Sequence, residues 1–146
     1  MRLARPILVI AIAVATSVAL SGCSVLAPTR DTDGKIISAT PMPSTDAWVG
    51  DCFTFVDNSN FAYATVVPCS ESHEYVVIGR GVLSDARLAR FESLQLAVIA
   101  LCQSTFDAYA KDLDTDPEPK YIAARDTKPN GTEITNYSCL ATDSAP

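Results

Sequence analysis

Short stretches of alternating or clustered apolar residues, many of them β-branched or aromatic, recur from residue 52 to the end of the chain and are typical of β-strands. They cover residues 52–56, 61–67, 75–78 with an extension toward 83, 121–125, and 134–141. Turn-forming residues separate the strands, with Asp-Asn-Ser-Asn at 57–60 and Pro-Asn-Gly at 129–131. The pattern predicts a small antiparallel sheet of four to five strands.

The longest periodic stretch has helical spacing and runs over residues 85–111. Its apolar stripe consists of Leu88, Phe91, Val98, Cys102, Phe106 and Tyr109. Ser84 or Asp85 is a suitable N-cap. We expect one helix here, or two shorter helices that separate at Ser93. The fold class is therefore α+β, with the helix packed on one face of the sheet.

The N-terminal residues have the pattern of an export signal. Arg2 and Arg5 precede an apolar run from residue 7 to residue 20 that is too short for an ordinary membrane span. The run ends in Leu-Ser-Gly-Cys at 20–23, which resembles the lipobox of bacterial lipoproteins. That resemblance implies that residues 1–22 are a removed signal peptide and that Cys23 carries the lipid. An ordinary signal peptide with a chance cysteine is the alternative.

The residues after Cys23 have the composition of a linker. Residues 24–46 contain three prolines, many Ser, Thr and Asp residues, and little apolar periodicity. We expect residues 23–46 to be a lipidated N-terminus and flexible tether, in which only Ile36 and Ile37 are candidates for docking. The domain is expected to cover residues 47–146 and to begin near Trp48.

Composition and charge narrow the function. The 146 residues are 48% apolar and carry a net charge of −6, so we expect no nucleic-acid partner. Removal of residues 1–22 would take away two arginines and no acid. Because an anionic leaflet repels an acidic protein, membrane attachment is expected through the lipid and not through the domain surface.

The cysteines are expected to be structural. With Cys23 lipidated, the four that remain can form two disulfides in three pairings. Cys102 lies on the helix stripe and Cys139 on the apolar face of the last strand, so both should meet between helix and sheet. Cys52 and Cys69 lie at the outer ends of neighbouring strands. We therefore pair Cys52 with Cys69 and Cys102 with Cys139, and we expect no metal or cofactor, because no Cys-x-x-Cys or zinc-type spacing occurs.

Two residues are candidates for binding. His73 is the only histidine and is flanked in sequence by Glu71 and Glu74. We favour a ring bonded to backbone or carboxylate over a general base or metal ligand, and His73 is the best candidate for a pH-sensitive contact. Trp48 begins an aromatic cluster that could either fill the core or line a groove for a peptide or glycan. The other members of this cluster are Phe53, Phe55, Phe61 and Tyr63.

Four short motifs resemble one known family. They are Gly-Asp-Cys-Phe at 50–53, Val-Pro-Cys-Ser-Glu-Ser-His-Glu at 67–74, a cysteine-bearing helix that ends at 106–109, and Tyr-Ser-Cys-Leu at 137–140. This pattern resembles the actinobacterial septum formation-related domain family over residues 48–142. The resemblance implies a link to division or envelope growth and no defined activity.

We therefore expect a lipid-anchored, extracytoplasmic binding module of the bacterial cell envelope that is not an enzyme. Its partners would be the membrane, through the lipid, and an envelope protein or cell-wall component. The alternatives are an enzyme or accessory factor acting on cell-wall material, and a purely structural envelope lipoprotein.

Overall fold

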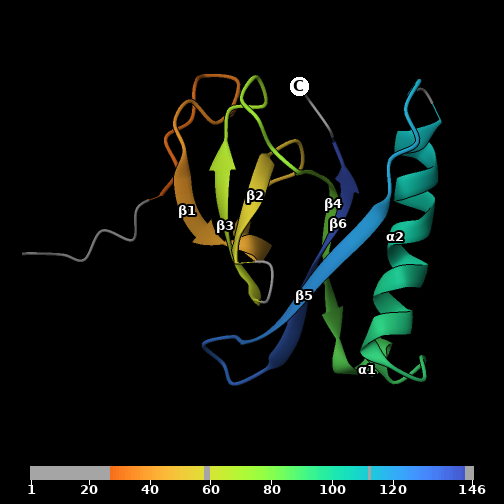
Figure 1. Cartoon of the computed structure of the whole chain (residues 1–146). Coiled ribbons are helices and arrows are strands. Elements are labelled where there is room, and N and C mark those ends of the chain that lie inside the picture. Colours follow the sequence, from red (N-terminus) through yellow and green to blue (C-terminus); the bar gives the residue numbers. More distant parts are fainter. Residues whose placement is uncertain (1–26, 58–59, 112, 144–146) are drawn as a thin grey trace, which may run out of the picture.

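A computed structural model describes residues 27–57, 60–111 and 113–143. These residues form one antiparallel sheet of six strands, in the order β1-β3-β2-β4-β6-β5, with one main helix (Figure 1). The strands are β1 (Thr40–Pro43), β2 (Cys52–Asp57), β3 (Asn60–Val67), β4 (Tyr75–Ser84), β5 (Pro119–Thr127) and β6 (Glu133–Thr142). The helices are a 3₁₀ turn, η1 (Ser44–Asp46), the short α1 (Asp85–Leu88) and α2 (Leu94–Ala110). The signal sequence and Cys23 lie outside the described residues.

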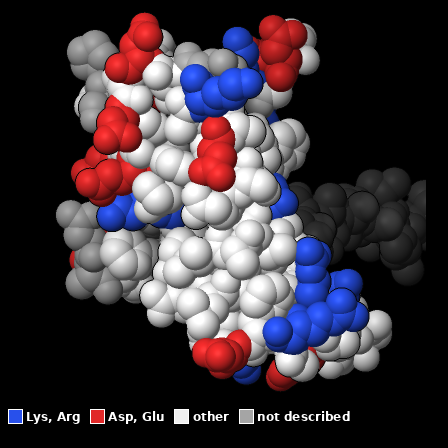
Figure 2. Space-filling view, turned by 90° about the vertical axis from the view of Figure 1, so that its right-hand side faces the viewer, with Lys and Arg blue, Asp and Glu red and all other residues white. Residues whose placement is uncertain are grey.

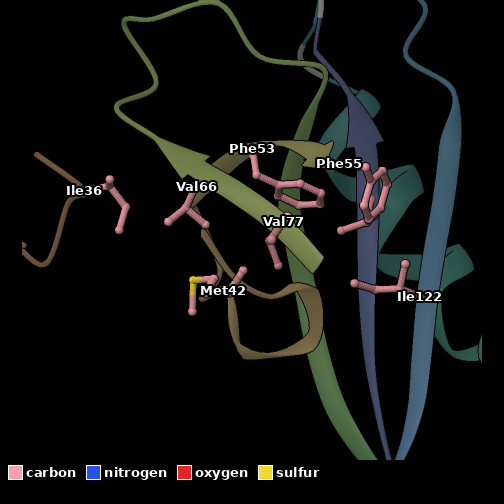
Figure 3. Packing of buried hydrophobic residues seen from close by; sticks show 10 residues of the cluster. Ile36, Met42, Phe53, Phe55, Val66, Val77 and Ile122 are labelled. Carbon is pink, nitrogen blue, oxygen red and sulfur yellow. The ribbon is translucent and has the colours of Figure 1, made fainter. Parts of the chain in front are cut away.

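The sheet curls around its own core. Phe53 and Phe55 of β2, Val77 of β4 and Ile122 of β5 belong to one buried cluster, although β2 and β5 lie far apart in the strand order (Figure 3). The cluster therefore fills the space between the β1-β3-β2 half and the β4-β6-β5 half. The two outermost strands, β1 and β5, are not paired with each other, and η1 contacts β5 between the two halves.

Helix α2 packs on the outer face of β4, β6 and β5. Val98 and Cys102 form a second buried cluster with Cys139 of β6. Neighbouring residues of a strand face opposite sides of the sheet, which is why Cys139 meets the helix while Leu140 joins the central core. The stretch from 85 to 111 forms two helices, the second of the two alternatives that the sequence left open. Helix α1 ends at Leu88, and Ser93 caps α2 by accepting a hydrogen bond from the Leu96 N–H at 3.2 Å.

The sheet has one strand more than expected, and the extra strand lies inside the stretch expected to be a tether. Strand β1 pairs with β3 in the register Thr40–Val66. Upstream of β1, Arg30 bridges Ile36, and the Ile36 side chain is buried in the central core. The folded unit therefore begins near residue 29 and not at 47. Sequence patterns miss β1 because Pro41 and Pro43 interrupt it, and proline is tolerated only in an edge strand such as this one.

Candidate functional site: an apolar groove beside a sheet edge

A groove of about 750 Å³ opens where the curled sheet fails to close. We call it the β5 groove. Four parts of the chain border it: η1 with the end of β1, the start of β3, the first turns of α2, and the middle of β5. It is lined by Pro43, Ser44, Thr45, Phe61, Ala62, Tyr63, Leu94, Gln95, Val98, Tyr121, Ile122, Ala123 and Ala124.

The first wall of the β5 groove is aromatic. Phe61 and Tyr63 remain 53% and 56% exposed, although both are large apolar side chains on a strand. One edge of Phe61 packs on the core ring of Phe55, with the ring centroids 4.8 Å apart. The buried Ser44 hydroxyl donates a hydrogen bond of 2.5 Å to the Phe61 carbonyl and so joins η1 to β3. These contacts hold Phe61 in place on this wall.

The second wall is the start of α2. Leu94 packs against the Cys102–Cys139 cluster, and Leu96 and Ile99, farther around the helix, are exposed. Asp107 is the one charged residue between Leu94 and Ala110. Figure 2 views the side of the molecule that carries α2 and shows a broad uncharged area with basic and acidic side chains toward its rims. The wall therefore continues into a neutral surface.

Strand β5 lies between the two walls. Four consecutive residues, 121–124, line the groove. Since neighbouring side chains of a strand point to opposite faces, such a run means that the groove follows the edge of β5 and not one of its faces. Ala123 and Ala124 are exposed and small, so the backbone at this edge is open to a ligand.

The lining of the β5 groove is uncharged. The residues that border the groove include no carboxylate, imidazole, thiol, amine or guanidinium. Among the described residues, no group of three or more His, Cys, Asp or Glu side chains could hold a metal ion. The groove is thus suited to an uncharged ligand.

Two disulfides crosslink the fold. Cys52 pairs with Cys69 and Cys102 with Cys139, the connectivity that the sequence analysis predicts. The sequence separations of 17 and 37 residues correspond to about 3 and about 4 kcal/mol of loop-closure stabilisation. The second bridge ties the α2 wall to β6, the neighbour of β5.

His73 is buried away from the groove. Its side chain is 1% exposed, and its Nδ1 lies 2.7 Å from the carbonyl oxygen of Glu71. Its Nε2 lies 3.5 Å from a carboxylate oxygen of Asp143. The ring is bonded to backbone and faces a carboxylate, the arrangement that the sequence favoured, and it holds the segment between β3 and β4 without presenting itself to a partner.

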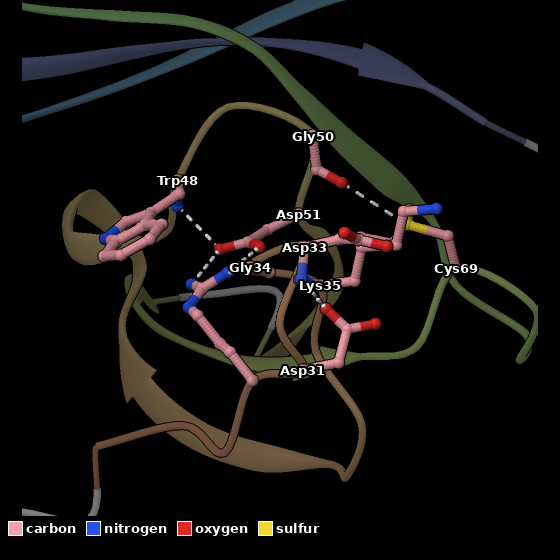
Figure 4. A network of polar contacts seen from close by, with 10 residues as sticks. Asp31, Asp33, Gly34, Lys35, Trp48, Gly50, Asp51 and Cys69 are labelled. Atoms are coloured by element: carbon pink, nitrogen blue, oxygen red, sulfur yellow. Dashed lines mark hydrogen bonds and ion pairs between the residues drawn. A yellow bond between two sulfur atoms is a disulfide. The ribbon is translucent and has the colours of Figure 1, made fainter.

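Trp48 is exposed, but it belongs to another cluster. The Arg30 guanidinium carbon lies 4.0 Å from the centre of its ring, and Arg30 forms two hydrogen bonds of 2.7 Å with the buried Asp51 carboxylate. These hydrogen bonds raise the pKa of Arg30 above its ordinary value. Asp51 also accepts the Trp48 N–H at 2.6 Å (Figure 4). Trp48 does not line the β5 groove; it covers the ion pair that fixes the N-terminal segment to the domain.

The motif at 50–53 therefore has a structural role. The Asp51 N–H donates to the Trp48 carbonyl at 3.0 Å, and Gly50 has φ +90°, as a type II turn requires. Asp51 then holds Arg30, and Cys52 forms a disulfide. The residues of this motif build the fold, and none of them lines the groove.

The aromatic cluster divides between the two roles proposed for it. Phe53 and Phe55 are core, whereas Phe61 and Tyr63 form a wall of the groove. Sequence reasoning missed the other side of the groove, at Leu94, Gln95 and residues 121–124. The only sequence signal for this side of the groove was the adjacent pair Ala123-Ala124, because two small side chains leave the backbone of β5 uncovered.

No protein-family model matches this chain, and no curated protein or solved structure is similar to it. The resemblance to septum formation-related domains thus stays a prediction that rests on the motifs alone. Among the described residues, no helix is both long and apolar enough to cross a membrane.

Proposed function

We propose that this protein is a lipid-anchored binding module of the bacterial cell envelope, exposed on the extracytoplasmic face, and that the β5 groove is its binding site. The observation that carries the proposal is the groove itself, with two exposed aromatic side chains on one wall and the uncharged first turns of α2 on the other. Exposed apolar surface of this kind is typical of interaction sites.

Two further features support this assignment. Two disulfides are typical of a domain in an oxidising compartment, outside the cytoplasm. The groove lining has no carboxylate or imidazole, and the sole histidine is buried elsewhere, so we assign binding and no catalysis to the site. A role in septation or envelope growth follows from the family resemblance and is part of the proposal.

The position of the folded N-terminal segment determines how far the module would lie from the membrane and which side would face it. Ile37 N–H donates to the Thr29 carbonyl at 3.1 Å, so the folded unit reaches back to residue 29. Residues 24–28 then span at most about 20 Å from a lipidated Cys23. The N-terminal segment lies on the opposite side of the molecule from α2 (Figure 1). In this arrangement the surface formed by the N-terminal segment and Trp48 is closest to the membrane, and α2 is farther away.

The anchoring is tested with Cys23→Ala. We expect this variant to be released into the soluble fraction or to remain an unprocessed precursor, because the proposed lipid attachment both anchors the mature protein and precedes removal of the signal peptide. Cell fractionation and mass spectrometry of the N-terminus provide the measurement. A Cys23→Ala protein that is processed, lipid-labelled and still membrane-bound would contradict the proposal.

The site is tested with Ala123→Glu, which places a charge in the uncharged groove. After chemical crosslinking in intact envelopes, recovery of the partner should fall about tenfold, since an unpaired charge at an apolar interface is costly. Ala108→Glu is the matched control, because Ala108 is exposed on α2 and does not line the groove. Equal recovery with both variants would place binding elsewhere.

A further inference from the structure

The hydrogen-bond register of β5 determines which backbone groups face the groove. Just beyond one end of β5, the Thr142 N–H donates to the Glu118 carbonyl at 3.0 Å; just beyond the other, the Lys128 N–H donates to the Thr132 carbonyl at 2.9 Å. The register between these pairs is continuous. Because hydrogen-bonded and non-hydrogen-bonded pairs alternate in an antiparallel ladder, the even-numbered residues of β5 bond to β6. The odd-numbered residues direct their N–H and C=O groups away from the sheet.

The two ends of this outward row offer no free donor. Pro119 has no N–H, and the Thr127 N–H donates to the Asp126 carboxylate at 2.8 Å. Tyr121, Ala123 and Arg125 remain, and within the described part of the chain no residue bonds to their backbone groups. We call these three N–H and three C=O groups the open edge. Tyr121 and Ala123 line the β5 groove directly.

We propose that the groove binds an extended segment of a partner polypeptide, which adds to the sheet as a seventh strand along the open edge of β5. This inference rests on the proposed function and names its ligand class. Backbone groups of the segment pair with Tyr121, Ala123 and Arg125. Its side chains alternate between the aromatic wall at Phe61 and Tyr63 and the helical wall at Leu94 and Gln95.

The surroundings favour this occupant over two others. A second copy of the chain would have to pair its own β5, but that edge lies between two walls in each molecule, and two recessed edges cannot meet. A glycan would find no carboxylate or guanidinium in the lining to bind its hydroxyl groups, whereas the open edge offers a row of backbone donors and acceptors at strand spacing. The absence of charge in the lining selects a segment with uncharged, mainly apolar side chains.

The opposite edge of the sheet is blocked by prolines inside the strand, whereas β5 has proline only at its first position and its charged residues lie toward its ends. Strand β1 has proline at positions 41 and 43, and neither can donate a hydrogen bond. In β5 the one proline stands at the first position, and the central residues are Tyr-Ile-Ala-Ala. An open edge at the bottom of an apolar groove is the arrangement that strand addition requires.

The test uses the full chain in lipid nanodiscs and a displayed library of random nonapeptides as the probe. Peptides enriched on the native protein should slow hydrogen exchange at the amides of Tyr121, Ala123 and Arg125 by about tenfold or more. The amides of Ile122 and Ala124 already bond to β6, so their exchange should not change. Mass spectrometry with single-residue fragmentation measures both sets.

A proline scan adds a matched pair of variants. Ala123→Pro removes an N–H that faces the groove and leaves the ladder to β6 intact, so we expect a folded protein that binds the selected peptides about tenfold more weakly. Ala124→Pro removes a ladder donor and should lower the melting temperature instead. If Ala123→Pro proves unfolded, peptides methylated at alternate backbone nitrogens replace it: methylation should weaken binding at every second position only.

Three results would overturn strand addition. One is enrichment of the same peptides on native and folded Ala123→Pro protein. Another is protection of the open edge that rises with protein concentration without peptide, which would identify a second copy. The third is a peptide or a soluble peptidoglycan digest that binds the groove and leaves the three amides unprotected; this would preserve the binding function and reject only its mode.

Discussion

At the scale of single residues, the most consequential contact is the ion pair between Arg30 and Asp51. Asp51 accepts three hydrogen bonds, two from the Arg30 guanidinium and one from the Trp48 N–H. The two side chains are 12% and 4% exposed, so removal of either charge leaves the other poorly solvated. Through this pair the segment that precedes β1 becomes part of the domain.

We therefore expect Asp51→Asn to lower the free energy of unfolding by about 3 kcal/mol, the usual cost of breaking a buried pair on one side. Urea unfolding under non-reducing conditions provides the measurement. Asp33→Asn is the control: Asp33 is exposed in the same N-terminal segment, and its change should stay within about 0.5 kcal/mol. Equal, small effects of both variants would mean that Arg30 does not anchor the segment.

At the scale of elements, the position of α2 depends on a glycine in β4. The register of β4 against β6 shifts between Val77 and Gly79, a bulge of the kind that glycine marks. A Cβ atom at Gly79 would lie 2.9 Å from Thr105 Cγ2 of α2 and 3.7 Å from Cys139 Cβ. The helix can approach the sheet this closely because residue 79 has no side chain.

Gly79→Ala should accordingly destabilise the fold by about 1–3 kcal/mol through overpacking. Thr105→Ala, introduced into the same chain, removes the clashing methyl group and should restore most of the loss, although Thr105→Ala alone is expected to be neutral or mildly destabilising. A double-mutant cycle of unfolding free energies measures the coupling. Additive effects of the two changes would contradict the proposed close contact.

The elements differ in how well sequence predicts them, and the reasons are physical. Strands β2 to β6 and helix α2 follow from local periodicity, because each buries one face or stripe. The disulfide pairs follow from the faces on which Cys102 and Cys139 lie. Strand β1 does not, since Pro41 and Pro43 mask it. Neither does the groove, which depends on the curl that brings η1 and β3 opposite α2 across β5, a long-range arrangement with no local pattern.

At the scale of the whole molecule, three features of the structure shape the β5 groove. The central core curls the sheet, the Cys102–Cys139 bridge fixes the α2 wall, and the Ser44–Phe61 hydrogen bond fixes the aromatic wall. The Arg30–Asp51 pair shortens the proposed tether. The described residues thus frame an uncharged recess, which is why we assign the function to that recess.

The most direct test of this assignment places a photoreactive benzoylphenylalanine at Tyr63 in one protein and at Leu94 in another, one on each wall, and irradiates intact envelopes. Both positions should crosslink to the same partner peptide, at sites within about five residues of each other along an extended chain. The same substitution at Ala108, outside the groove, should give no such product. Crosslinks from the two walls to unrelated proteins, or yields no higher than at Ala108, would contradict the assignment of the groove as the binding site.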